Sequence, residues 1–169
     1  MASVRNLCKT GILLDKGCID KTGEINEVVD YYLQGQKTLN DFERWGNGDA
    51  RFVDFKQSAE GIELGDDLAI DFTIYVNKDC ELINISLDIK DETMSQISHI
   101  ANYDDQFVLR NVKAGETLNV HCVMKNLNLA PGSYCAHIWM GDPYNAFDWV
   151  GECVRFYIKQ GERRISLCL

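Results

Sequence analysis

The chain has 169 residues, of which 46% are hydrophobic, so it is globular and can bury one ordinary core with a small appendage. Its 17 Lys and Arg residues are outnumbered by 26 Asp and Glu residues, and the net charge of -9 repels a phosphate backbone and excludes DNA and RNA as partners. Neither an apolar run of about 18 residues nor a signal peptide is present, so the sequence predicts neither a membrane span nor export.

The first 36 residues combine helical and strand-like patterns. Val4, Leu7 and Cys8 recur at helical spacing, "GILLDKG" is typical of a short strand with a turn, and "CIDKTG" is its return strand. A second helix is predicted after Gly23 from residues at the helical period, namely Val28, Val29, Tyr32 and Leu33. These elements are too few for an independent core, so we interpret residues 1–36 as a fragment of another domain.

Residues 37–48, "KTLNDFERWGNG", are polar and contain glycine, which is typical of a linker. From Asp49 onward, apolar and polar residues alternate in about eight short segments separated by turn residues. This pattern without intervening helices predicts an all-β fold over residues 49–169, an antiparallel β-sandwich of immunoglobulin-like or jelly-roll-like type. The final "RRISLCL" is a candidate edge strand that could pair across a dimer.

Cysteine and histidine spacing predicts no metal site. The seven cysteines form no Cys-x-x-Cys pair and are odd in number, so reduced and mostly buried thiols are expected. His99, His121 and His137 are too widely separated for a helical i, i+4 ligand pair. We therefore expect neither a metal nor a cofactor.

The N-terminal segment resembles the end of the nucleotide-binding domain of ABC transporters, just after the switch histidine. The matching positions are Met1, Leu7-Cys8, Ile12 to Leu14, Asp15-Lys16-Gly17, Gly23, Val28-Val29 and Tyr31 to Leu33. This resemblance points to the ATPases of polysaccharide exporters, whose C-terminal extension is a β-sandwich that recognises glycan. It implies that residues 1–36 are the remnant of a nucleotide-binding domain.

The remainder of the chain resembles that extension as it occurs in Wzt-type proteins. Its segments follow the same order: "RWGNGDARFVDF", "ELGDDLAIDFTIYV", "NVKAGETLNV", "NLAPGSYCAHIWM" and "FDWVGECVRFYI". The resemblance implies a non-catalytic domain that recognises the end of a lipid-linked polysaccharide of O-antigen type for export. It also implies a homodimer with exchange of the C-terminal strand, a transmembrane subunit as partner, and a cytoplasmic location at the inner membrane.

Catalysis by the chain itself is not expected. It contains no Gly-x-x-x-x-Gly-Lys-Ser/Thr loop to hold a nucleotide, so it is no ATPase alone, and Met1 is expected to be an internal methionine of a parent protein or a chosen start. A glycosidase would need two carboxyl groups about 5 to 9.5 Å apart, and no pair among the 26 acidic residues stands out.

Sugar binding needs aromatic faces for C–H stacking and polar groups for hydroxyls. Opposite the apolar face, the strand pattern presents several such side chains to solvent. These candidates are His137, Trp139, Trp149, Arg155 and Tyr157, with Tyr75, His99 and Tyr144 as further candidates. The loop "GDPYNAFD" adds Asp148, whose carboxylate is suited to sugar hydroxyls.

The alternative interpretation is a structural homodimerisation module in which the outward aromatic residues are buried between subunits. Trp149 could also close the end of the core. Trp45 is expected to be a plug between the linker and the sandwich.

Overall fold

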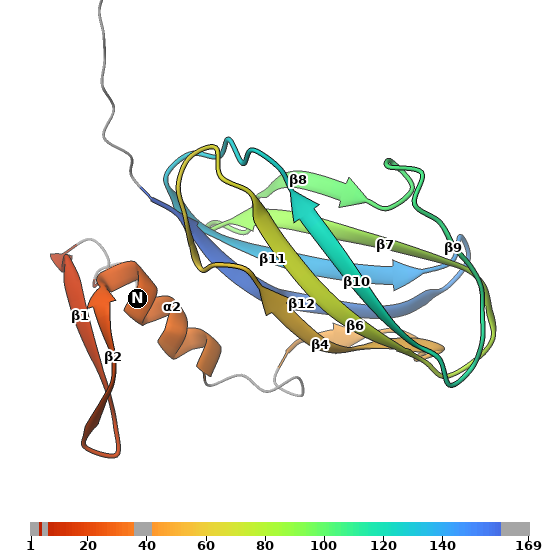
Figure 1. Cartoon of the computed structure of the whole chain (residues 1–169), viewed down its shortest axis with the longest axis horizontal. Coiled ribbons are helices and arrows are strands. Elements are labelled where there is room, and N and C mark those ends of the chain that lie inside the picture. The colour runs from red at the N-terminus through yellow and green to blue at the C-terminus, as the bar shows by residue number, and fades with distance from the viewer. Residues whose placement is uncertain (1–3, 5–6, 36–41, 160–169) are drawn as a thin grey trace, which may run out of the picture.

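The structure is a computed structural model that describes residue 4 and residues 7–35 and 42–159. Its main body is a β-sandwich of two facing sheets (Figure 1). The smaller sheet has the strand order β10 (Thr117–Met124), β6 (Leu68–Val76) and β4 (Ala50–Gln57). The larger sheet has the order β3 (Arg44–Trp45), β12 (Ala146–Ile158), β11 (Gly132–Gly141), β7 (Cys80–Asp91) and β8 (Gln96–Ala101).

Short strands complete the larger sheet. β9 (Leu109–Val112) pairs with β7, and β5 (Gly61–Ile62) pairs with β12 in the parallel direction, whereas the other strand pairs are antiparallel. No helix interrupts the part of the sandwich that the structure describes. The predicted all-β, antiparallel sandwich is therefore confirmed.

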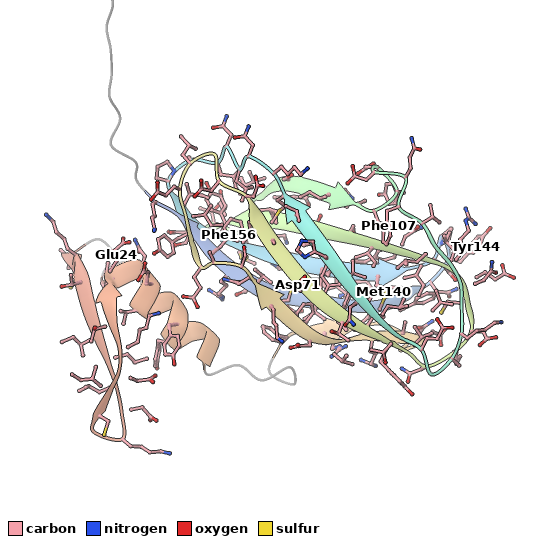
Figure 2. The ribbon with its side chains drawn as sticks, viewed as in Figure 1. Glu24, Asp71, Phe107, Met140, Tyr144 and Phe156 are labelled. Atoms are coloured by element: carbon pink, nitrogen blue, oxygen red, sulfur yellow. The ribbon has the colours of Figure 1, made fainter. Side chains whose placement is uncertain are left out.

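The core lies between the two sheets and follows the predicted alternation. On β6, the inward residues are each at most 3% exposed: Leu68, Ile70, Phe72, Ile74 and Val76. The facing strands contribute Met140 and Phe156, both fully buried (Figure 2). Because each strand buries alternate side chains, the opposite series on each sheet is left facing outward.

The N-terminal unit consists of the hairpin β1 (Thr10–Asp15) and β2 (Cys18–Glu24), followed by helix α2 (Ile25–Gly35). The hairpin and this helix occur where the sequence predicts them. Helix α2 buries Ile25, Val28 and Val29, which recur on one helical face. Val4 and Leu7 are also helical, while most neighbours of these residues lie outside the described part.

The segment before β4 belongs to the sandwich and is not a free linker. Trp45 and Arg44 of β3 pair with Trp149 and Val150 of β12, and the amide of Gly48 donates to the carbonyl of Phe147 at 2.9 Å. Residues 36–41 of the expected linker and the candidate strand "RRISLCL" lie outside the described residues. No helix in the described part is long and apolar enough to cross a membrane.

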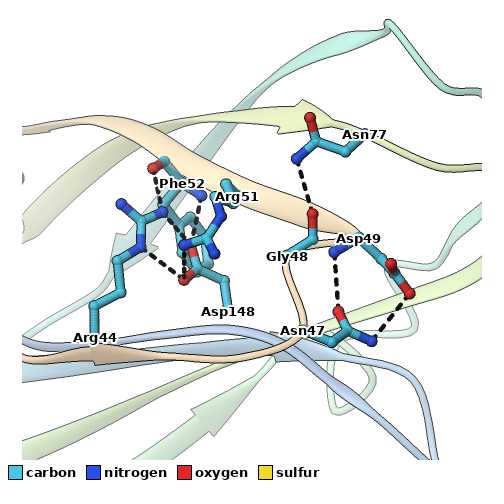
Figure 3. Close-up of polar contacts among 8 residues, drawn as sticks. All are labelled: Arg44, Asn47, Gly48, Asp49, Arg51, Phe52, Asn77 and Asp148. Carbon is cyan, nitrogen blue, oxygen red and sulfur yellow. Dashed lines mark hydrogen bonds and ion pairs between the residues drawn. The ribbon is translucent and has the colours of Figure 1, made fainter.

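Asp148 anchors this entry segment from inside the sandwich (Figure 3). Its carboxylate is fully buried, accepts a hydrogen bond from Arg44 Nε at 2.8 Å, and accepts another from the Phe52 amide at 2.8 Å. Arg44 also donates to the Phe52 carbonyl at 2.7 Å. The expectation that Asp148 is available to sugar hydroxyls is therefore corrected, because the carboxylate faces the interior and is already paired.

Candidate functional site

The outward face of the larger sheet gathers aromatic side chains at the end where β3 joins it. Register pairs Trp139 of β11 with Trp149 of β12, and Trp149 with Trp45 of β3. The rings of Trp45 and Trp149 stack with centroids 5.9 Å apart and planes 22° apart. The chain's three tryptophans thus form one row across neighbouring strands, the tryptophan row.

Two glycines let these rings lie along the sheet. A Cβ added at Gly141 would come within 2.5 Å of the Trp139 ring, and one at Gly151 would come within 2.8 Å of the Trp149 ring. Trp139 and Trp149 are half-buried, while Trp45 is 52% exposed. Rings lying on a sheet offer a flat apolar surface, which is the shape that stacks on a sugar ring.

His137 lies beside the tryptophan row and carries an unsatisfied polar atom. Its ring centroid is 5.4 Å from that of Trp149, and the residue is only 6% exposed. Nε2 is 3.7 Å from the Cys135 sulfur, whereas the buried Nδ1 has no hydrogen-bond partner among the described residues. A buried polar group without a partner is uncommon and requires an explanation, such as a ligand group that binds there.

Burial also sets the charge of His137. Desolvation lowers the pKa of the imidazole below its usual value, and the nearby positive charge of Lys90 lowers it further, although Asp88 opposes this effect. The ring is therefore neutral near pH 7, with one nitrogen able to donate and the other able to accept.

Charged side chains surround the aromatic centre. Asp88 of β7 lies opposite His137 in the register and contacts His99 Nδ1 at 2.7 Å. His99 Nε2 lies 3.4 Å from the Tyr103 hydroxyl. On β12, Arg155 forms an ion pair with Glu152. The face therefore combines flat apolar rings with both donors and acceptors.

The structure brings together five of the predicted candidates on this face, namely His137, Trp139, Trp149, Arg155 and His99. Trp45, expected to be a plug, extends the same row. Its strand has only two residues, so no alternation in the sequence could reveal its outward direction. The glycines that follow it in "RWGNG" are the only local signal of a close approach to another strand.

The other candidates lie elsewhere. Tyr144 is 91% exposed in the turn between β11 and β12 and projects from the end of the sandwich (Figure 2). Tyr75 lies on the smaller sheet, on the outward side of β6. Tyr157 is 2% exposed, and its hydroxyl donates to Glu27 at 2.9 Å, so it contacts the N-terminal unit instead of joining the tryptophan row.

The outward side of the smaller sheet is a separate polar surface. Asp71 contacts His121 Nδ1 at 2.6 Å, and Thr73 donates to Asn119 at 3.0 Å. These residues line a shallow hollow of about 290 Å³. Among the described residues, no group of three His, Cys, Asp or Glu side chains could hold a metal ion.

The protein is a β-sandwich with an aromatic surface on the outward face of its larger sheet. The sequence profile of the Wzt C-terminal domain matches residues 41–167, so the chain belongs to the Wzt C-terminal domain family. Domains of this family are non-catalytic and serve, in general terms, as carbohydrate-binding domains of polysaccharide ABC transporters. The sequence-based resemblance to Wzt-type proteins is thereby confirmed.

Solved structures agree on the fold. The crystal structure of the C-terminal domain of Wzt has a TM-score of 0.63 at 13% identity, over 72% of this chain and 80% of that one. A Niemann-Pick type C2 protein from the Japanese carpenter ant has a TM-score of 0.52 at 12% identity, over 70% of this chain and 98% of that one. No curated protein sequence matches the chain significantly.

Proposed function

We propose that the outward face of the larger sheet binds the end of a lipid-linked polysaccharide of O-antigen type and presents it to an ABC exporter. One observation carries this proposal: the unsatisfied Nδ1 of the buried His137 lies beside the tryptophan row. An apolar partner would leave this already buried nitrogen without a hydrogen bond, whereas a sugar hydroxyl can supply one.

Each part of the face has a role in this proposal. The tryptophan row stacks on the C–H face of a sugar ring, and the neutral His137 exchanges a hydrogen bond with a hydroxyl. Asp88 and Arg155 lie where they can contact further hydroxyls at the border. Binding at one site is weak, and two sites in a homodimer raise the apparent affinity through effective concentration.

The N-terminal unit supports an origin in a larger ATPase subunit at the cytoplasmic side of the inner membrane. The hairpin exposes apolar side chains that a hairpin of a complete domain would bury: Ile12 is 66% exposed, Leu14 62% and Ile19 65%. In this proposal, the rest of a nucleotide-binding domain covers them, and a transmembrane subunit is the further partner.

The test is a titration of the 169-residue protein with the polysaccharide of its source strain, with unrelated polysaccharides as controls. Trp139→Ala should weaken binding by about tenfold, because it removes a stacking ring. Tyr75→Ala is the matched control, since this exposed aromatic residue lies on the other sheet, and it should change the affinity by less than about twofold.

The competing function, a homodimerisation module, predicts a different result for the same variants. If the outward rings were buried between subunits, Trp139→Ala would convert dimers to monomers in analytical ultracentrifugation and leave any glycan affinity per subunit unchanged. Loss of glycan binding with the oligomeric state intact supports the recognition function. Absence of saturable binding by the folded wild-type protein overturns it.

A further inference from the structure

Figure 1 shows β8 and β10 as the outermost strands on one side of the sandwich. A cavity opens between the two sheets on this side. This edge cavity has a volume of about 400 Å³ and is separate from the tryptophan row. Its walls come from both sheets and from the loop after β8. The lining is mainly apolar and includes Phe72, Ile85, Leu87, Ile100, Val120 and Cys122.

The floor and the border of the edge cavity are fixed before any ligand arrives. Ile85 and Leu87 are each 3% exposed and belong to the packed core. At the border, Asn102 accepts a hydrogen bond from the Ile85 amide at 2.8 Å and donates to the Phe107 carbonyl at 2.7 Å. These bonds hold the loop that carries Phe107, a residue that is 48% exposed and that is labelled in Figure 2.

The dimensions of the edge cavity favour a chain-like ligand. It runs along the edge strand β10 from residue 119 to 123, a length of about 13 Å, where the half-buried Val120 and Cys122 face between the sheets and the exposed residues of the opposite series border the opening. A cavity of about 150 Å³ accommodates benzene, so the larger edge cavity, with its open entrance, has room for an alkyl chain of about ten carbons.

The charges at the entrance exclude an anionic head group. Asp105 lines the entrance, and His121 there is already paired with Asp71. The lining residues that the structure describes include no lysine or arginine. A carboxylate or phosphate at this position would meet negative charge without a cationic partner, in a protein whose net charge is -9.

We propose that the edge cavity binds the single alkyl chain of an uncharged amphiphile. The chain lies along β10 between the sheets, and its uncharged polar head remains at the entrance near Asn102 and Asp105. Such a chain can belong to a free neutral lipid or be attached to a sugar. The two sources share the same chemistry, and the experiment separates them.

The experiment titrates the full chain with alkyl β-glucosides of increasing chain length, below their critical micelle concentrations. Affinity should rise about fourfold per methylene and then level off once the cavity is full. Monoacylglycerols of equal chain length should show the same plateau if the alkyl chain alone is recognised, and much weaker binding if a sugar-linked chain is required. Fatty acid anions should bind about tenfold more weakly than either neutral series.

Cys122 reports the location of the bound chain. Its half-buried thiol lines the edge cavity, whereas Cys8 and Cys18 are exposed in the N-terminal unit. Bound alkyl β-glucoside should slow the reaction of Cys122 with N-ethylmaleimide and leave the reactions of Cys8 and Cys18 unaffected. The rates are measured peptide by peptide by mass spectrometry. If Cys122 is protected in concentrated protein without any alkyl β-glucoside, a second copy of this protein occupies the cavity, and the proposal is overturned.

Two variants test the site itself. Val120→Phe fills the cavity and should lower the affinity by about tenfold, while Val53→Phe, the same change at an exposed position of β4 outside the cavity, should leave it within about twofold. If Val120→Phe fails to fold, Phe107→Ala at the exposed border provides the same test. Affinity that rises without a plateau, or equal binding by all variants, overturns the proposal.

Discussion

At the scale of single residues, His137 has a pKa that affects the stability of the fold. Burial lowers the pKa of this imidazole in the folded protein, so the unfolded chain binds a proton more readily. Its contribution to stability is complete above the unfolded pKa of about 6.5 and is lost as the pH falls from there through the lower folded pKa. Acidification should therefore destabilise the fold.

The measurement is urea unfolding at about pH 7.5 and about pH 5.5, for the wild-type protein and for His137→Gln. The wild-type protein should lose more free energy of unfolding than the variant, because glutamine has no proton to bind. His121→Gln is the control, since that ring is exposed on the other sheet. Equal pH dependence in the wild type and His137→Gln would contradict the assignment of the buried ring as neutral.

Asp148 shows what residue type alone could not predict. A carboxylate in a glycine- and proline-containing loop is usually exposed, but its partner, Arg44, lies 104 residues earlier in the chain. Its position two residues before the inward Val150 is consistent with an inward direction. The alternation along β12 therefore indicated that Asp148 points inward. Its charge suggested exposure instead, because the pairing with Arg44 is not visible in the sequence.

At the scale of elements, alternation predicted the inward series even across an irregularity. β12 departs from regular pairing between Val150 and Val154, which oppose Ile138 and Ala136 of β11. In this stretch β12 has an even number of extra residues relative to β11. The alternation therefore stays in phase, and Trp149 and Arg155 still face outward together. Alternation placed Trp139 and Trp149 on one outward face, but the register of the distant strand β3 is not visible in one sequence, so the place of Trp45 in the row could not be predicted.

Strand β3 depends on Gly46, which gives the element-scale prediction. Gly46 has φ of +141°, and a Cβ there would lie 2.4 Å from the Phe147 carbonyl oxygen. Gly46→Ala should displace β3, lower the free energy of unfolding by about 2 kcal/mol, and remove the stacking of Trp45 on Trp149. The stacking is measured by the exciton signal of the paired indoles in circular dichroism.

Gly115→Ala is the matched control for this prediction. Gly115 has φ of +88° with nothing within 4 Å of an added Cβ, so its substitution introduces backbone strain of about 1 kcal/mol without a collision. The exciton signal should persist in Gly115→Ala. Persistence of the signal in Gly46→Ala as well would show that β3 tolerates the added methyl group and that the close approach does not fix the position of Trp45.

At the scale of the whole molecule, Tyr157 connects the sandwich to the N-terminal unit. Its ring lies against Gly61, and its hydroxyl donates to Glu27 of α2 at 2.9 Å and is 3.4 Å from Glu24 at the end of β2. Outward alternation made Tyr157 a candidate for sugar binding, but the sequence contains no information on how the N-terminal unit is placed. Contact between the two parts explains why this residue is covered.

Tyr157→Phe should loosen that connection while leaving both parts folded. A hydrogen bond to a carboxylate is worth about 1.5 to 3 kcal/mol, so amide hydrogen exchange in α2 should accelerate by about ten- to a hundredfold, whereas β6 and β11 should keep their protection. Tyr134→Phe makes the same change on the same sheet, where the hydroxyl donates to the Ala130 carbonyl at 2.8 Å, and it should not alter exchange in α2. Unchanged exchange of α2 in Tyr157→Phe would mean that apolar packing alone joins the units. Accelerated exchange would show that β12, which carries Trp149 of the tryptophan row, also holds the N-terminal unit through Tyr157.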